Sequence, residues 1–377
     1  MTDPLTLWML INRLADGGAE RLTVELASRL PDRGYRVTVC TTRDDTDDNA
    51  FRRHQRDRLA AAGVELVSVG RRHRLDSLKM RRLPALLRRG RVDILHTHLY
   101  GSNLWGTVLG RLAGVPAIVA HEHGWSYRPS TRRWFDGQVI ARLSSAFVVG
   151  SASNRTHMIV LEGVAPAKAV LIPNAFFPRE EHGGDLRREL GVDEDALLIG
   201  TVAKLRREKA LDLLLAAFAR VLIEIPHARL VIAGDGALRR ELEEQARVLG
   251  IAAATFFLGA REDVDTILRA LDITVVCSDF EATSLFALEA MTYGSALVCT
   301  EVGGLRELLI DGRDGVLVPP RDAAALGQAI VTLGRDADQR ARLVRAASKR
   351  AEAFSAETLV DRYDGLYRSL AARSRGG

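Results

Sequence analysis

The chain contains few cysteines and few aromatic residues, and it lacks long apolar runs. Among its 377 residues are 3 cysteines, and phenylalanine, tryptophan and tyrosine together make up 6%. Cys40, Cys277 and Cys299 are far apart without paired spacing, which is typical of buried, reduced thiols and not of disulfides or a zinc site. No run of about 18 apolar residues occurs, so we expect no membrane-spanning helix. No basic segment precedes the first apolar run as in a secretion signal, so we expect a cytoplasmic protein.

Positive charge is unevenly distributed, although the formal net charge is only +5. Residues 1–180 contain 27 basic and 17 acidic side chains, whereas residues 181–377 contain 26 and 31. Most of the excess lies between Arg52 and Arg91. Two interpretations stay open: solvated helix faces and loops, or attraction to an anionic membrane surface or a phosphate-bearing acceptor. Aromatic residues are not interleaved with these basic ones, so we expect no nucleic-acid partner.

Apolar runs of strand length alternate with helical patterns, and this alternation occurs twice along the chain. Segments such as LTLWMLIN and YRVTVCTT in the first half, and LLIGTVAKL and DITVVCS in the second, predict short buried strands. Between them, segments such as GAERLTVELASRL and ALDLLLAAFARVLIEI predict helices, because their apolar residues recur every three or four positions. We therefore predict an α/β protein of two doubly wound domains, joined near residues 171–186, with ligands bound at the carboxyl ends of the strands.

The common nucleotide-cofactor motifs are missing. Neither a G-x-G-x-x-G turn nor a Walker lysine loop follows a predicted strand, which removes the main support for a dinucleotide cofactor or P-loop chemistry. Two glycine-containing turns remain, Gly17-Gly18 and the GDG segment at 234–236. Each suits a tight strand-to-helix turn, and each also lets backbone amides approach an anion.

Two glutamates, Glu281 and Glu289, follow a predicted strand and enter a helix predicted to begin at Thr283 or Ser284. Two carboxylates at this spacing arise easily by chance, but the segment EATSLFALEAM resembles the signature of the retaining GT-B glycosyltransferases of glycosyltransferase family 4. That signature is a Glu, seven residues, and a Glu followed by Ala-Met. The resemblance extends in order along nearly the whole chain, through GGAER, DILHTH, AHEHG, IPNA, GTVAKLRREKALDLLLAAF, VIAGDG, FFLGA, VGGLRELLIDGRDGVLVPPRD and the closing FSAETLVDRYDGLYRSL.

The resemblance implies a GT-B fold, in which two doubly wound Rossmann-like domains face a central cleft. Residues 1–172 would form an N-terminal acceptor-binding domain, residues 173–356 a C-terminal nucleotide-sugar-binding domain, and residues 357–377 a helix that crosses back to the N-terminal domain. The implied activity is metal-independent transfer of a sugar from a nucleotide diphosphate, usually UDP, with retention and without a cofactor. No residue stands out as a covalent nucleophile, so the resemblance implies front-face displacement, in which the departing phosphate oxygen helps to deprotonate the acceptor.

Cationic side chains are expected around the diphosphate, because it gains charge as the sugar departs as an oxocarbenium-like ion. The resemblance assigns this role to Lys204 and Lys209; two ordinary surface lysines are the alternative. It places Glu281 at the hydroxyls of the transferred sugar and Glu289 at the ribose hydroxyls, and carboxylates accept such hydrogen bonds. The family usually has Arg at position 204 and Gly at position 210, where this chain has Lys204 and Ala210. Lysine keeps the charge of arginine but lacks its two-pronged geometry.

Backbone amides at a helix start are expected to hold phosphate oxygens of the donor. The resemblance assigns this role to Ser284, Leu285 and Phe286. Gly17 and Gly18 are expected to let the backbone of the first domain approach the donor diphosphate from the side opposite the two lysines. The family commonly has Gly after the first Glu, whereas Ala282 restricts the backbone there.

Four histidines form two pairs at predicted strand ends, His96 with His98 and His121 with His123. Residues i and i+2 of a strand point to one face, so each pair could converge on a metal ion. No carboxylate or thiol arrangement completes such a site and the resemblance is to metal-independent enzymes, so we predict no metal. The family places a His near the donor sugar at the end of the later strand, which His123 matches best, with His121 as the alternative register. The His96 pair is expected to pack at its strand end, with a position of the segment HTHLYGSN beside the acceptor site as the alternative.

Two acidic stretches suggest a different, metal-dependent class of glycosyltransferase that uses Asp-x-Asp. Asp263 and Asp265 open a predicted helix, where acidic residues cap and favour the helix start. The run at 44–48 is expected to be a solvated loop.

The sequence thus predicts a retaining hexosyltransferase whose acceptor is a polyprenyl-diphosphate-linked sugar or a growing polysaccharide of the cell envelope. The basic first domain favours a peripheral position on the inner face of the cell membrane. A sugar-nucleotide epimerase or hydrolase of the same fold, or a non-catalytic sugar-nucleotide or membrane-binding module, stays open as an alternative.

Overall fold

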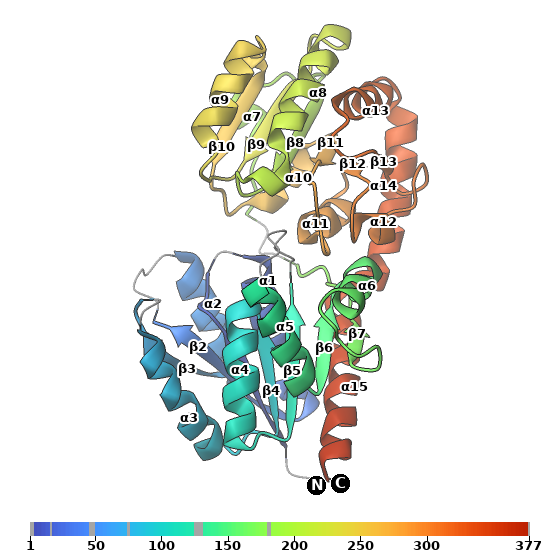
Figure 1. Ribbon diagram of the computed structural model, residues 1–377. Coiled ribbons are helices and arrows are strands. Elements are labelled where there is room, and N and C mark those ends of the chain that lie inside the picture. Colours follow the sequence, from blue (N-terminus) through green and yellow to red (C-terminus); the bar gives the residue numbers. More distant parts are fainter. Residues whose placement is uncertain are drawn as a thin grey trace. The chain divides into compact units, whose positions relative to one another are not determined.

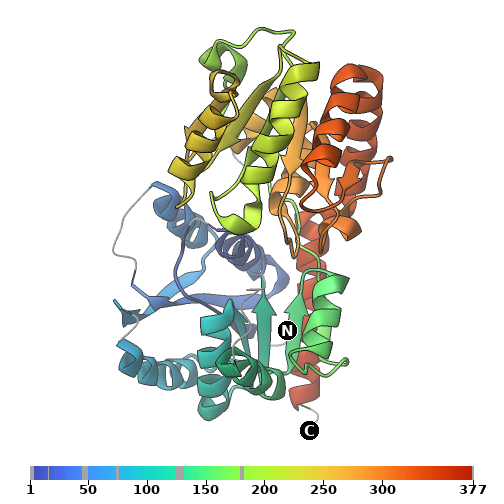
Figure 2. The same cartoon turned by 45° about the horizontal axis from the view of Figure 1, so that its top comes forward.

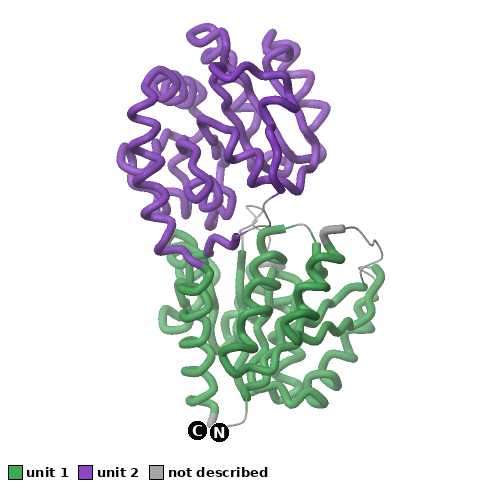
Figure 3. Tube along the Cα trace, turned by 180° about the vertical axis from the view of Figure 1, so that it is seen from behind, with its two compact units in different colours: residues 1–174, 356–377 green, residues 175–355 purple. Residues whose placement is uncertain are grey.

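The computed structural model describes residues 4–15, 17–44, 50–73, 76–123, 131–178 and 182–375 (Figure 1). The contacts divide the chain into two compact units, shown in Figure 3. Unit 1 comprises residues 1–174 and 356–377, and unit 2 comprises residues 175–355. The last helix of the chain therefore belongs to the same unit as the N-terminal half.

The described residues of unit 1 form a seven-stranded parallel sheet covered by helices. In sheet order the strands are β3 (Glu65–Arg71), β2 (Tyr35–Arg43), β1 (Leu5–Ile11), β4 (Ile94–His98), β5 (Ala117–Glu122), β6 (Ala146–Val149) and β7 (Ala169–Leu171). The helices are α1 (Gly18–Arg29), α2 (Ala50–Ala61), α3 (Leu83–Arg89), α4 (Tyr100–Ala113), α5 (Thr131–Leu143), α6 (Ala152–Val160) and α15 (Ala356–Arg375).

The described residues of unit 2 form a six-stranded sheet. Its strands, in sheet order, are β10 (Thr255–Gly259), β9 (Arg229–Ala233), β8 (Leu198–Val202), β11 (Ile273–Val276), β12 (Ala296–Thr300) and β13 (Val316–Val318). The helices are α7 (Leu186–Leu190), α8 (Leu211–Glu224), α9 (Arg239–Val248), α10 (Val264–Ala270), α11 (Leu285–Tyr293), α12 (Leu305–Leu308), α13 (Ala323–Arg335) and α14 (Ala337–Ala351). Helices α8 and α13 run side by side (Figure 2), and Gly327 lets α13 approach the backbone of Ala217.

Consecutive residues of the unit 2 strands enter two different hydrophobic cores. Ile199 belongs to the core that contains α8 and α13, whereas its neighbour Leu198 belongs to the core of α10, α11 and α14. Val275 and Val276 of β11 divide in the same way. Side chains alternate between the faces of a strand, so both faces of the sheet are buried, as parallel sheets require. This confirms the predicted doubly wound architecture.

The predicted strands are all present, and the structure adds one. Strand β7 has only three residues, Ala169–Leu171, and its sequence is too short for a periodic signal. Cys40, Cys277 and Cys299 are buried and free, as predicted. Within the described ranges, no helix combines the length and the apolar character that crossing a membrane requires.

Candidate active site

The largely buried carboxylate of Glu281 accepts two polar contacts from side chains of unit 2. Lys209 Nζ lies 2.5 Å from Glu281 Oε1, although the two residues are 72 positions apart in sequence. Ser278 donates a second hydrogen bond to the same oxygen at 2.8 Å. Glu281 is 9% exposed, so the lysine and the hydroxyl offset the cost of removing the carboxylate from water. The structure brings together two residues that the sequence assigned to the donor site; Ser278 had no signal in the sequence.

Two glycines hold the backbone of the loop that carries Glu281. Gly304 N donates a hydrogen bond to Glu281 O at 2.7 Å. A Cβ at Gly303 would lie under 3.0 Å from that carbonyl oxygen, and a Cβ at Gly304 would lie as close to the one of Ala282. Gly303 also has a φ of 44°, which favours glycine. The VGG segment therefore positions Glu281, a role that its place in the family pattern did not reveal.

Helix α11 begins directly after this loop. Ser284 is its N-cap, one of the two residues near which the sequence predicted the helix to begin, and Ser284 Oγ accepts a hydrogen bond from Ala287 N at 3.2 Å. Leu285 and Phe286 are the first two residues of the helix, where amides lack intrahelical acceptors and favour an anion. Glu289 lies on the same helix and is 4% exposed. Their assignments to phosphate and ribose stay predictions.

The two departures from the family's glycines differ in their structural consequence. Ala210, at the start of α8, has a φ of 49°, the conformation that glycine adopts most readily. Ala282 does not adopt a positive φ, so an alanine fits there without backbone strain. Cys277 supports the turn before α8 by donating to the carbonyl oxygens of Lys209 and Ala210 at 3.2 and 3.3 Å. Burial raises the pKa of this thiol to about 12, so it is protonated and able to donate.

Lys204 is exposed on a loop that the GDG segment supports. Gly234 has a φ of 127°, and a Cβ there would overlap the carbonyl oxygen of Ala203. Leu205 N donates to Asp235 O at 3.0 Å, which fixes the other side of Lys204. Of the two interpretations left open for GDG, the structure shows the tight turn, packed against the backbone on both sides of Lys204.

Gly17 and Gly18 form the start of α1 in unit 1. Gly17 is the N-cap with a φ of −148°, extended backbone that any residue adopts. A Cβ at Gly17 would overlap the carboxylate of Glu20, which lies in the first turn of the helix. Gly17 N donates to Ala15 O at 3.0 Å. The described residues therefore show Gly17 and Gly18 at a helix start, while the contact of these glycines with a donor diphosphate stays a prediction.

The histidines gather at the ends of two neighbouring strands of unit 1. His98 of β4 lies beside His121 of β5 in the parallel register, and residues i and i+2 share a face, so all four rings lie on one side of the sheet. His98 Nδ1 lies 2.9 Å from His123 Nε2. Desolvation lowers the pKa of His123 to about 3, so this ring is neutral at physiological pH. His121 is 1% exposed, whereas His123 is half-buried, which makes His123 the more accessible of the two.

Two tyrosines of α15 form hydrogen bonds with histidines of this group. Tyr367 Oη lies 2.6 Å from His96 Nδ1, and Tyr363 Oη lies 3.1 Å from His121 Nδ1. His96 is fully buried at the strand end, as predicted, and its ring packs with those of His98 and His121. Burial lowers the pKa of His96 and His121 well below the ordinary value. No sequence pattern indicated the tyrosine contacts.

The acidic pair at the start of α10 has ion-pair partners, and its predicted capping role is wrong in detail. Asp263 occupies the N-cap position without a side-chain capping bond and instead contacts Arg261 through two hydrogen bonds. Asp265 accepts from His182, whose Nδ1 lies 3.0 Å from Asp265 Oδ1. Most of the acidic run at 44–48 lies outside the described residues.

Comparison with known proteins places the chain in a family. A family model described as "Glycosyltransferase Family 4" matches residues 16–177, and one described as "Glycosyl transferases group 1" matches residues 184–350. A D-inositol 3-phosphate glycosyltransferase from Geodermatophilus obscurus is 31% identical over 397 residues, covering 94% of this chain and 85% of the relative. An Escherichia coli UDP-Gal:alpha-D-GlcNAc-diphosphoundecaprenol alpha-1,3-galactosyltransferase is 27% identical over 298 residues, covering 75% of this chain and 76% of the relative.

Solved structures identify the fold. The structure of Anabaena HepE in complex with UDP-glucose aligns with a TM-score of 0.83 at 22% identity, covering 97% of this chain and 100% of that chain. The fold is therefore GT-B, as the sequence predicted. Together with the family matches, this shows that the chain belongs to the retaining GT-B glycosyltransferases of family 4.

Proposed function

We propose that the chain transfers a hexose from a UDP-sugar, with retention, to a lipid-linked or polysaccharide acceptor in cell-envelope glycan synthesis. The observation that carries this proposal is the contact of Lys209 with Glu281 directly before the N-terminus of α11. It brings a cation from the turn before α8 to the carboxylate that directly precedes the first-turn amides of α11. A nucleotide-diphosphate sugar presents the matching groups, which are an anionic diphosphate and vicinal hydroxyls.

Each group in this stretch has a distinct proposed task. The Lys209 ammonium and the amides of Leu285 and Phe286 stabilise the charge that develops on the diphosphate. Both described contacts of the Glu281 carboxylate use Oε1, so Oε2 is the oxygen that we assign to a sugar hydroxyl. Glu289, farther along α11, binds the ribose. Cations and amides of the chain supply the charge compensation, so we propose that the transfer step needs no divalent metal at the diphosphate.

His123 of unit 1 has a proposed task of its own. Its pKa of about 3 means that the ring is neutral, so it contributes a hydrogen bond and no charge near the donor sugar. The hydrogen bond between His98 Nδ1 and His123 Nε2 leaves His123 Nδ1 as the atom that we assign to the substrate. The departing phosphate oxygen takes the proton of the acceptor hydroxyl, and the protein supplies position and electrostatic stabilisation.

The names of the relatives support the substrate classes. The HepE structure contains UDP-glucose, and the Escherichia coli relative is named for a UDP-galactose donor and a diphosphoundecaprenol-linked acceptor. The Geodermatophilus obscurus relative is named for a phosphate-bearing compound, D-inositol 3-phosphate. We favour a lipid-linked acceptor because the first half of the chain carries the excess of basic side chains.

The decisive experiment measures free nucleotide after incubation with a panel of nucleotide sugars, with and without a polyprenyl-diphosphate-linked acceptor and in the presence of a chelator. We expect slow UDP release from one UDP-sugar alone and a faster release with acceptor. Lys209→Ala and Glu281→Ala should each lower turnover about 10²–10³-fold, since each removes a group that acts on developing charge or orientation. The matched controls are Lys349→Ala on α14 and Glu208→Ala, both exposed residues of unit 2.

The outcomes separate the alternatives. An altered sugar or free sugar without any acceptor dependence would favour an epimerase or hydrolase. Donor binding without turnover would favour a non-catalytic module. Wild-type turnover in both Lys209→Ala and Glu281→Ala would refute the site assignment.

A further inference from the structure

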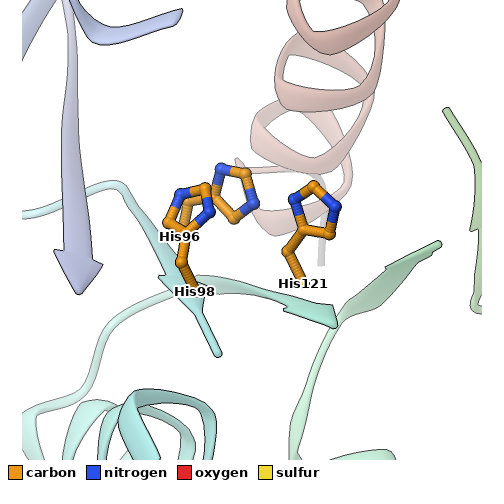
Figure 4. A group of neighbouring side chains, drawn as sticks. All are labelled: His96, His98 and His121. Atoms are coloured by element: carbon orange, nitrogen blue, oxygen red, sulfur yellow. The ribbon is translucent and has the colours of Figure 1, made fainter. Parts of the chain in front are cut away.

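Three histidine side chains in unit 1 form a buried cluster, and none of the three has a direct contact with substrate in the proposed transfer. His96 and His98 are 0% exposed and His121 is 1% exposed. One ring nitrogen from each lies within 4.8 Å of one ring nitrogen of the other two. Figure 4 shows the three imidazole rings grouped at the ends of β4 and β5. The alternation of strand side chains puts them on one face, and the register of β4 with β5 sets His98 beside His121.

Each ring is oriented through its Nδ1 atom. His96 Nδ1 contacts Tyr367 Oη at 2.6 Å, and His121 Nδ1 contacts Tyr363 Oη at 3.1 Å. His98 Nδ1 contacts His123 Nε2 at 2.9 Å. Histidines that bind metals in proteins have such partners, because a hydrogen bond at one ring nitrogen fixes the tautomer and the orientation of the other.

In two of these rings, the second nitrogen has no hydrogen-bond partner among the described residues. Nε2 of His96 and Nε2 of His98 are buried and have no hydrogen-bond partner within the described part of the chain. Buried polar atoms are nearly always bonded, and an orphaned one calls for a bound ion or an ordered water as its explanation. Two orphaned nitrogens on rings whose centroids lie 4.0 Å apart, with the ring of His121 nearby, point to a ligand that accepts several lone pairs at once. A metal cation is such a ligand.

Contrary to the sequence-based prediction of no metal at these histidines, we propose that His96, His98 and His121 bind one divalent transition-metal ion of the zinc class. Imidazole nitrogens suit Zn²⁺, Co²⁺, Ni²⁺ and Cu²⁺, whereas Mg²⁺ and Ca²⁺ take oxygen ligands. Three imidazoles are a known zinc donor set, with a water as the fourth ligand. Around a tetrahedral ion with Zn–N of about 2.0–2.1 Å, ligand nitrogens lie roughly 3.4 Å apart. Binding therefore requires the rings to turn: the ring nitrogens approach from a separation of up to 4.8 Å, while the rings of His96 and His98, whose centroids are 4.0 Å apart, move apart.

The site links three segments that are distant in sequence. Its ligands come from β4 and β5, and the tyrosines that orient them come from α15, so the ion fastens the last helix to the sheet of unit 1. Coordination through Nε2 of His98 also requires its proton on Nδ1, where it is donated to His123 Nε2. The binding itself does not rest on the proposed transferase activity, and neither Lys209 nor Glu281 takes part in it.

The test uses the full chain without a histidine tag, stripped with a chelator and titrated with Co²⁺ alone. We expect about one equivalent to bind with the visible absorption bands of tetrahedral Co²⁺, and Zn²⁺ to displace it. His96→Phe and His121→Phe should abolish the bands, whereas His157→Phe, on α6 of the same unit, should keep them. Zn²⁺ should also raise the thermal unfolding temperature of the stripped protein, because a ligand of the folded state stabilises it.

Tyr367→Phe tests the site without removing a ligand, which matters if the histidine variants fail to fold. It keeps the ring that packs beside His96 and removes only the hydroxyl, so Co²⁺ affinity should fall about 10–100-fold with the stoichiometry unchanged. Mg²⁺ should produce no stabilisation. The proposal is overturned if the stripped protein binds no Co²⁺, which would leave an ordered water at the orphaned nitrogens. Equal binding by wild type and a folded His96→Phe variant would overturn it as well, since the ion would then sit elsewhere.

Discussion

Replacing Gly303 by alanine should disturb the backbone that positions Glu281, while every side chain assigned to the donor site stays unchanged. The new Cβ would lie under 3.0 Å from the carbonyl oxygen of Glu281, a separation that real Cβ atoms essentially never show. The φ of 44° adds about 1–2 kcal/mol for an L side chain in the left-handed region. Together with the overlap, which costs about 1–3 kcal/mol, we expect a destabilisation of about 2–5 kcal/mol if the loop stays in place.

If the loop moves instead, the stability cost falls and the position of Glu281 changes. Either way, donor use should suffer more than for Gly312→Ala, the matched control. Gly312 has a φ of 69°, but a Cβ added there would meet no atom within 4 Å, so its variant carries only the conformational cost of about 1–2 kcal/mol.

The assay measures urea unfolding and UDP release from the preferred donor for both variants. We expect Gly303→Ala to lose at least about tenfold in kcat/KM for the donor while Gly312→Ala keeps its activity. Equal stability losses and wild-type donor turnover in both variants would show that the Gly303 loop does not position Glu281.

Two further predictions concern acid stability and membrane association. In the presence of a chelator, the unfolding free energy should fall as the pH drops from about 6.5 towards 3, because buried neutral imidazoles such as His96 and His123 take up protons only on unfolding. The expected slope is about 1.4 kcal/mol per pH unit for each imidazole. Urea titrations of wild type and His96→Phe at several pH values measure this slope. A slope that His96→Phe leaves unchanged would contradict the burial of a neutral ring. The basic first half should retain the protein on anionic liposomes at low salt and release it at high salt, which sedimentation measures, and no retention at low salt would remove the support for a peripheral position.

The tertiary structure decided how distant residues meet. The contact of Lys209 with Glu281 spans 72 positions, and those of Tyr363 and Tyr367 with the histidines span 242 and 271. Periodicity places His96 and His98 on one face of a strand, but it does not say which helix covers that face. The capping role expected of Asp263 was wrong because Arg261, two residues away, binds its carboxylate in preference to the helix amides.

The sequence by itself determined the class of fold and the family, because strand and helix periodicities are local and because the motif around Glu281 and Glu289 is contiguous. It also placed the start of α11 near Thr283 or Ser284, and the structure selects Ser284 through its capping bond to Ala287 N. Only the tertiary structure revealed the role of Gly303, the hydrogen bonds from Cys277 to the turn before α8, and the buried histidine cluster. Each depends on the close approach of backbones or rings from separate elements, and no local pattern records such an approach.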